Sequence, residues 1–175
     1  PSGSGKSTIF KILLKMIQPT SGYVLIDKQN IYDANIDYLR SNISIVNQNT
    51  ILFNDTVYNN IVYNNDKVSK NRVLVTMKKL GLDQTIFKNI KLDQSVGVDG
   101  YYLSSGQRQM ILILREYLNN KKIILMDEPT ASLDPETKVF IIQILLAISK
   151  NKTIIVTTHD SIFKNYANKI IYITK

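Results

Sequence analysis

The chain of 175 residues has no cysteine, a single histidine and few arginines. Without cysteine, disulfide bonds and thiolate metal sites are excluded. Long hydrophobic runs are also missing, because the longest, at 139–148, is interrupted by Gln143 and is too short to cross a bilayer as a helix. Hydrophobic residues nevertheless make up 44% of the sequence, which is enough for the buried core of one globular domain.

The net charge is +8, because 22 basic residues outnumber 14 acidic ones. The basic residues are 18 lysines and only 4 arginines, and they are scattered along the sequence. Nucleic-acid-binding surfaces favour arginine, whose planar fork matches phosphates and base edges. The lysines are accompanied by 17 asparagines and 26 isoleucines, a combination typical of an AT-rich genome. We therefore expect no nucleic-acid partner, although the chain is basic.

Short apolar segments alternate with amphipathic ones, a pattern that predicts an α/β domain with a largely parallel sheet. Ser104 and Asp134 are natural N-terminal helix caps, Pro135 suits a first helical turn, and Gly81 suits a C-terminal cap. Strands are expected at 23–27, 43–46, 123–127, 153–157 and 169–173, and helices at 6–17, 68–80, 104–118 and from 135 onward. Between the second and third strands the pattern turns helical, which predicts a helical insertion.

A loop rich in glycine and serine stands at the start of the sequence, Gly3-Ser4-Gly5-Lys6-Ser7-Thr8. Glycines let the backbone curl so that successive N–H groups point at phosphate oxygens, and a following helix adds the positive end of its dipole. Lys6 is placed to reach the β- and γ-phosphates, and Ser7 to bind Mg²⁺ through its hydroxyl. The alternative is an ordinary turn, which the motifs further along the chain disfavour.

Two adjacent carboxylates, Asp127 and Glu128, come at the end of the apolar segment 123–126. At the carboxyl edge of a parallel sheet, a carboxylate can hold the water shell of Mg²⁺. Two carboxylates in a turn are usually only solvated, but the buried strand before them favours a functional pair. The single histidine, His159, likewise follows an expected strand, 153–157.

The segment Leu103-Ser104-Ser105-Gly106-Gln107 closely matches the LSGGQ signature of the ABC ATPases. With the phosphate loop, the carboxylate pair and the histidine in this order, the whole chain resembles the nucleotide-binding domain of that family. The resemblance implies a P-loop NTPase core, with a helical subdomain at about 52–103 and the ATP-binding core in the rest of 1–175. The family's first strands and its adenine-stacking aromatic residue would precede Pro1, so a partial domain is expected.

The resemblance also implies ATP and Mg²⁺ as ligands and a role for each motif. Ser7 and Asp127 would bind Mg²⁺, and Gln48 would touch both the metal and the attacking water. Glu128 would polarise that water as general base, and His159 would contact the γ-phosphate. The signature would face ATP held by a second cassette, with the N-terminus of its helix as the anion site. The residues expected to bind nucleotide are Gly3, Ser4, Gly5, Lys6, Ser7, Thr8, Ser104, Gly106, Gln107 and Asp134.

The stretch 38–61 resembles exporter cassettes, most of all those of mitochondrial ATM-type and heavy-metal-tolerance half-transporters. This implies a homo- or heterodimer of cassettes, with transmembrane domains in the same or a partner chain. The membrane would be that of an integral transporter, with the mitochondrial inner membrane as one candidate. The chain departs from the family pattern at Asn47, Gln94, Val98 and Ser105. The segments 126–132 and 157–160 are more like importer ATPase subunits, so an importer subunit is the alternative.

Soluble ABC ATPases are the other class that the motifs allow. Chromosome-structural and repair members split the cassette with a long coiled coil, whereas fewer than a hundred residues without sustained heptads separate Lys6 from Ser104. Ribosome-associated members carry two cassettes in one chain and stay open as an alternative. A regulatory cassette that does not hydrolyse ATP is disfavoured, because Glu128 and His159 are both present. The resemblance implies that the contacts selecting the transported substrate lie in the membrane domains, so the cassette sequence does not specify that substrate.

Overall fold

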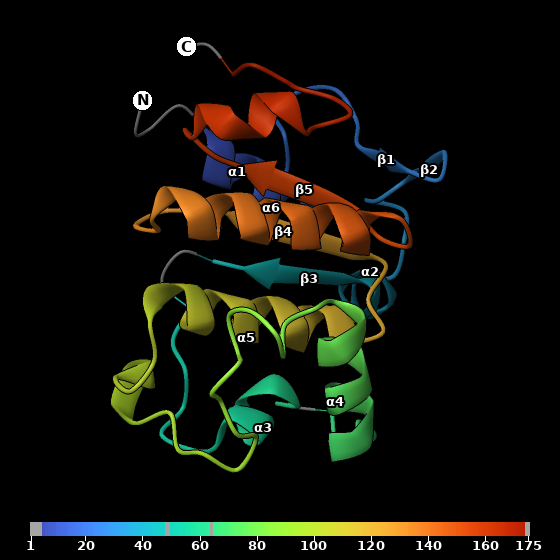
Figure 1. The fold of residues 1–175 in the computed structure, drawn as a ribbon. Helices are drawn as coiled ribbons and strands as arrows, with labels where there is room; N and C mark the ends of the chain where they lie inside the picture. Colours follow the sequence, from blue (N-terminus) through green and yellow to red (C-terminus); the bar gives the residue numbers. More distant parts are fainter. Residues whose placement is uncertain (1–4, 48–49, 64, 174–175) are drawn as a thin grey trace.

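A three-stranded parallel sheet forms the centre of the computed structural model, which describes residues 5–47, 50–63 and 65–173. Its strands lie in the order β3 (Ile43–Val46), β4 (Ile123–Asp127) and β5 (Thr153–Thr157), with β4 in the middle (Figure 1). The register of β4 with β5 runs from Ile123 opposite Thr153 to Asp127 opposite Thr157. Because the strands are parallel, their carboxyl ends meet at one edge of the sheet.

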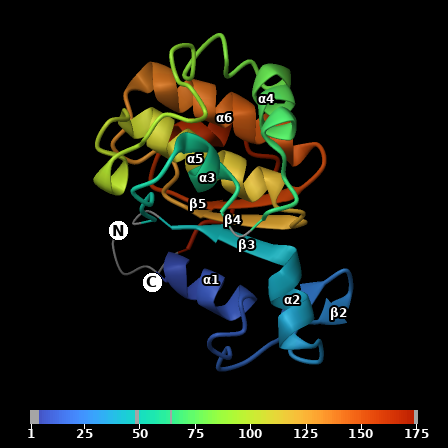
Figure 2. The same ribbon diagram turned by 90° about the horizontal axis from the view of Figure 1, so that it is seen from below.

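Both faces of the sheet are covered by helices. Figure 2 shows α5 (Ser105–Leu118) and α6 (Pro135–Ser149) on one face and α1 (Lys6–Leu13) on the other. Ile124 and Met126 of β4 join the larger hydrophobic cluster with α5 and α6, whereas Leu125 joins the smaller cluster with Phe10 of α1. Since side chains alternate across a strand, a strand that is buried on both faces must be apolar throughout, as Ile123–Met126 is.

The two long helices begin at the caps that the sequence predicts. Ser104 accepts a hydrogen bond from the Gln107 N–H at 3.2 Å, and the Gln107 side chain accepts one from the Ser104 N–H at 2.9 Å. Asp134 accepts a hydrogen bond from the Thr137 N–H at 2.9 Å. Hydrogen bonds from the side chain and the backbone of Thr137 lower the pKa of the Asp134 carboxyl. Each cap satisfies backbone donors that a helix leaves unpaired at its start.

The helical insertion predicted between β3 and α5 is present. It contains α3 (Val57–Ile61), α4 (Lys70–Lys79) and the 3₁₀ turn η1 (Val98–Gly100). The buried apolar side chains of α3 and α4 belong to the same hydrophobic cluster as those of α5 and α6. Over the part of the chain that the structure describes, no helix is both long and apolar enough to cross a bilayer.

A buried polar network ties this insertion to α5. Asn60 is 0% exposed, and its Nδ2 donates to the carbonyls of Phe53 and Thr56 at 3.0 Å each. Its Oδ1 accepts from the Phe53 N–H at 2.9 Å, and its carbonyl accepts from Nε of Arg115 at 2.7 Å. The Arg115 guanidinium lies over the stacked rings of Phe53 and Tyr63, and its burial lowers the pKa of Arg115. The network therefore fixes the segment that follows β3 against α5.

Three expectations from the sequence are wrong in extent or in kind. The first helix ends at Leu13 rather than at 17, and Lys15 has a left-handed φ of 52° that is incompatible with its continuation. The strand expected at 23–27 shrinks to β1 (Leu25–Ile26), which pairs with β2 (Gln29–Asn30) in a separate antiparallel hairpin. Residues 169–173 form no regular element, and Ile171 and Tyr172 are 74% and 71% exposed. Two further short elements, α2 (Ile36–Asn42) and η2 (Ser161–Asn165), complete the fold.

Adjacent asparagines test the buried network. We expect Asn60→Ala to lower the free energy of unfolding by about 2–3 kcal/mol, because it leaves buried backbone groups without partners. Asn59→Ala is the matched control, since Asn59 is exposed and its side chain donates to the exposed Asp55, and it should change stability by about 0.5 kcal/mol or less. Urea unfolding of the two variants measures the difference, and equal losses would contradict the role of Asn60.

Candidate functional site

The carboxyl ends of β4 and β5 bring the carboxylate pair next to the single histidine. The Glu128 N–H donates to the Thr157 carbonyl at 2.8 Å, which extends the ladder one residue beyond Asp127. Glu128 itself has a left-handed φ of 51°, a conformation that side-chain-bearing residues rarely adopt. The chain therefore turns at Glu128, and its carboxylate lies against the segment that follows β5.

Two threonine hydroxyls at the end of β5 each bond one of the two carboxylates. Thr157 Oγ1 donates to Asp127 Oδ1 at 2.6 Å, and Thr158 Oγ1 donates to Glu128 Oε2 at 3.1 Å. The His159 N–H reaches the same Oε2 at 3.3 Å. Glu128 Oε1 is buried and bonds no group among the described residues, with Nε2 of His159 3.9 Å away. The two oxygens of Glu128 are therefore in different environments.

The first turn of α1 meets the same edge of the sheet. Ser7 Oγ donates to Asp127 Oδ2 at 3.3 Å, and Lys6 Nζ lies 2.6 Å from His159 Nε2. An ammonium group has only donors, so the ring nitrogen accepts and the ring proton belongs on Nδ1. Gly5 precedes the helix with a φ of 92°, which glycine adopts readily. Lysine, serine, two carboxylates and histidine thus converge from three elements.

The signature residues lie at the start of α5, on the opposite face of the sheet from α1 (Figure 2). A Cβ on Gly106 would stand 2.6 Å from Cγ2 of Thr137, so glycine permits the close approach of α5 to α6. Gln107 closes the capping box with Ser104, and its Nε2 donates to the Ile86 carbonyl at 3.1 Å. Gly106 and Gln107 thus have structural contacts within the chain, and Ser104 is the exposed member.

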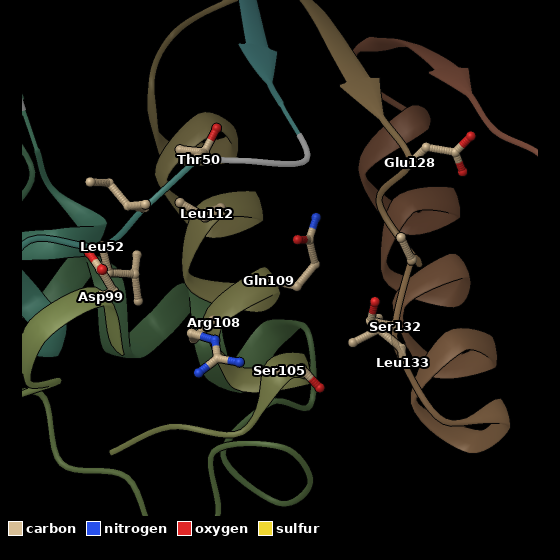
Figure 3. A pocket seen from close by; sticks show the side chains of 12 residues that line it. Thr50, Leu52, Asp99, Ser105, Arg108, Gln109, Leu112, Glu128, Ser132 and Leu133 are labelled. Carbon is tan, nitrogen blue, oxygen red and sulfur yellow. The ribbon is translucent and has the colours of Figure 1, made fainter. Parts of the chain in front are cut away.

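A cavity of about 430 Å³ separates α5 from the turn that follows β4 (Figure 3). Gln109 points into this space from the α5 side, and Ser132, with a left-handed φ of 63°, lines the opposite side. Other lining residues are Thr50, Leu52, Ser105, Arg108, Glu128 and Leu133. The cavity is therefore lined by the signature helix on one side and by the turn that carries Glu128 on the other.

Most of the predicted site lies within the described structure. The residues that the structure brings together are Lys6, Ser7, Asp127, Glu128 and His159. Thr8 is exposed in the first turn of α1, and Asp134 caps α6. Gly3, Ser4 and Gln48 lie outside the described residues, and their roles stay predictions.

Sequence reasoning missed Thr157 and Thr158. The available signal was their position: both end or directly follow a strand that is parallel to the one ending in Asp127. Parallel neighbours in matched register place such residues at the same sheet edge. Only the pairing of β4 with β5, which no single segment specifies, assigns each hydroxyl to its carboxylate.

Comparisons with known proteins agree on one family. The family model for ABC transporters matches residues 1–131. The ABC transporter ATM1 of Plasmodium falciparum (isolate 3D7) is 40% identical over 98% of this chain and 16% of its own length. The ATP-dependent lipid A-core flippase of Neisseria meningitidis serogroup B is 34% identical over 97% of this chain and 28% of its own length. A solved structure of a bacterial Atm1-family ABC exporter with ATP bound matches with a TM-score of 0.78 and 35% identity, over 96% of this chain and 29% of that one.

The chain thus spans between 16% and 29% of the length of these three relatives. The match to a solved exporter confirms the predicted fold, a P-loop NTPase domain of mixed α/β type with a parallel sheet. The Neisseria relative is named a flippase and the solved structure an exporter, which supports the exporter prediction over the importer alternative. The chain belongs to the ABC transporter family, as an ATP-hydrolysing domain whose relatives include an exporter and a flippase.

Proposed function

We propose that the site at the carboxyl edge of the sheet binds ATP with Mg²⁺ and hydrolyses it to drive transport by an exporter half-transporter. The observation that carries this proposal is the convergence of α1, β4 and β5, with Lys6 2.6 Å from His159 and Ser7 3.3 Å from Asp127. A cation, a histidine, a hydroxyl and carboxylates at one helix N-terminus suit a nucleoside triphosphate bound with Mg²⁺.

The phosphates would lie over the N-terminus of α1. Gly5, Lys6, Ser7 and Thr8 supply its first backbone donors, and Gly3 and Ser4 extend the loop by their place in the motif. Lys6 and His159 are close enough to contact one phosphoryl group together. This proximity supports the proposal that His159 contacts the γ-phosphate, the outermost group of ATP.

Ser7 and Asp127 fit a magnesium site. Their oxygens converge, and Mg²⁺ prefers hard oxygen ligands, usually one or two from protein together with phosphates and water. Among the described residues, no group of three or more histidine, cysteine or acidic side chains is arranged to hold a metal ion, so a shared protein–phosphate site suits them better than a protein-only cage. Gln48 is proposed as a further contact from its place in the motif. When bound, Mg²⁺ neutralises charge on the phosphates.

Glu128 is the proposed general base. Thr158 and His159 hold its Oε2 and so orient the carboxylate that would take a proton from the attacking water. The water oxygen then bonds to the γ-phosphorus, while the bond from that phosphorus to the bridging oxygen of ADP breaks. Positioning and charge stabilisation carry most of such a reaction, because the phosphoryl group itself needs little covalent help.

The signature is proposed to serve ATP bound by a second cassette, in a homo- or heterodimer. Two observations support this: α5 and α1 pack on opposite faces of the sheet, and the exposed Ser104 stands at the positive end of a 14-residue helix. Gly106, Gln107 and Asp134 would hold the adjoining segments in place for the partner's nucleotide.

The proposed transporter includes membrane domains in the same or a partner chain. The helical subdomain, at about 52–103, would be attached to an ATP-binding core formed by the remainder of the chain. A relative from Arabidopsis thaliana named ABC transporter B family member 24, mitochondrial, is 35% identical over 90% of this chain. This supports the mitochondrial inner membrane as one proposed location, and we propose no nucleic-acid partner.

Replacing Glu128 by glutamine separates chemistry from binding. We expect Glu128→Gln to reduce ATP turnover about 10²–10⁴-fold, the usual contribution of a positioned base. Binding of MgATP should persist, because Lys6, Ser7 and Asp127 are unchanged, and ATP-bound dimers should accumulate. Phosphate release and size-exclusion chromatography measure the two effects. Turnover at the wild-type rate would show that another group is the base.

A mixture of two variants tests the shared site. Ser104→Arg should leave each subunit able to bind ATP but block closure, because the signature must come within hydrogen-bonding distance of the γ-phosphate. Lys6→Ala should weaken phosphate binding in its own subunit. A heterodimer of the two contains one site with Lys6 and Ser104 both intact, so mixing should restore part of the activity.

Nucleotide binding by each variant alone is the control for this mixture. If Ser104→Arg abolishes ATP binding in the monomer, and the wild-type protein forms no ATP-dependent dimer, the signature acts within its own chain. That outcome would exclude the shared site.

A further inference from the structure

We propose that Thr158 is a positioning residue for ATP hydrolysis. Its hydroxyl holds Oε2 of Glu128 and so fixes the orientation of the carboxylate that takes a proton from the attacking water. This inference rests on the proposed function, in which Glu128 is the general base. It adds a residue directly before His159 for which the sequence motifs predict no role, and which acts only through Glu128.

The hydrogen bonds around Thr158 define the direction in which its hydroxyl donates. The Asp160 N–H lies 2.9 Å from Thr158 Oγ1, and a backbone N–H can only donate. The hydroxyl therefore accepts from Asp160 and has its single proton available for Glu128 Oε2, 3.1 Å away. A hydrogen bond to an ionised carboxylate is about twice as strong as one between neutral groups.

The turn that holds Thr158 is itself anchored to other elements. The Asp160 carboxylate forms an ion pair with Lys138 of α6 at 2.8 Å and accepts from Thr130 Oγ1 at 3.3 Å. It also caps η2 by accepting from the Ile162 N–H at 3.2 Å. With its side chain held on three sides, Asp160 keeps its backbone donor aimed at Thr158. The position of the hydroxyl is thus set by α6 and η2 as well as by β5.

The two oxygens of Glu128 are distinguished by these contacts. Oε2 accepts from Thr158 and from the His159 N–H, whereas Oε1 is buried and bonds no described group. The terminal torsion of a glutamate is broad and roughly two-fold, so an unheld carboxylate samples many orientations. Since a misplacement of about 1 Å can cost as much as 10²-fold in rate, fixing this torsion matters for catalysis.

Thr157 and Thr158 each donate a hydrogen bond to a different one of the two neighbouring carboxylates. Thr157 bonds Asp127, which belongs to the proposed magnesium site, and Thr158 bonds Glu128. Loss of the second hydroxyl should therefore leave ATP and Mg²⁺ binding intact and slow only the chemical step. This separation distinguishes a positioning residue from one that merely stabilises the fold.

The test is Thr158→Val in the complete protein, which removes the hydroxyl while keeping the shape of the side chain. We expect the single-turnover rate of ATP hydrolysis to fall about tenfold, with the KM for ATP unchanged and ATP-bound dimers accumulating on size-exclusion chromatography. Thr158→Ser keeps the hydroxyl and should restore most of the rate. Thr153→Val is the matched control, because Thr153 is an exposed residue at the start of the same strand.

The double variant with Glu128→Gln tests whether Thr158 acts through the base. Once the base is removed, Thr158→Val should reduce the residual rate no further, whereas independent effects would multiply. An unchanged rate in Thr158→Val, a raised KM alone, multiplying effects or a failure of Thr158→Ser to recover each overturns the proposal. If Glu128→Gln is slow but Thr158→Val is normal, only the positioning role fails; if Glu128→Gln is itself fully active, the base assignment fails with it.

Discussion

The parallel pairing of β4 with β5 is the constraint on which the site depends. It places Asp127 opposite Thr157 and continues through the bond from the Glu128 N–H to the Thr157 carbonyl. A slip of one residue would move every side chain of β4 to the other face. Close packing opposes that slip, because Ile124 and Leu125 fill positions in different hydrophobic clusters on the two sides of the sheet, and the two side chains differ in shape. The core therefore sets the register, and the register sets the pairing of hydroxyls with carboxylates.

What the sequence reveals depends on whether a feature is local. Apolar runs buried on both sides, the caps at Ser104 and Asp134 and the order of the motifs are contained in short segments, and all were predictable. The end of α1, the strand expected at 169–173 and the roles of Thr157 and Thr158 depend on distant partners. An apolar run such as 169–173 becomes a strand only where a neighbouring strand offers backbone groups, and its exposed side chains gain little burial. Motif residues were thus easier to predict than the groups that orient them.

The signature shows that a motif residue can have a structural reason for its identity. Gly106 permits the contact of α5 with α6, and Gln107 joins the start of α5 to the carbonyl of Ile86. A substitution at either position changes packing or capping before it changes any contact with a phosphate. Ser104 differs because its side chain is exposed, although it also serves as a cap. Replacing Ser104 is therefore the cleaner test of whether the signature contacts a phosphate bound by a second cassette.

The position of the cavity follows from two sets of contacts that meet there. On one side, Asn60 and Arg115 bind the insertion to α5, so that the walls formed by Leu52 and Arg108 belong to one packed unit. On the other side, Glu128 is held to the end of β5 through Thr158 and His159. The polar networks run within each side, while the space between them is lined by Gln109 and Ser132 (Figure 3). The general-base candidate is consequently positioned by the sheet and not by the signature helix, whose N-terminal residue Ser104 is exposed.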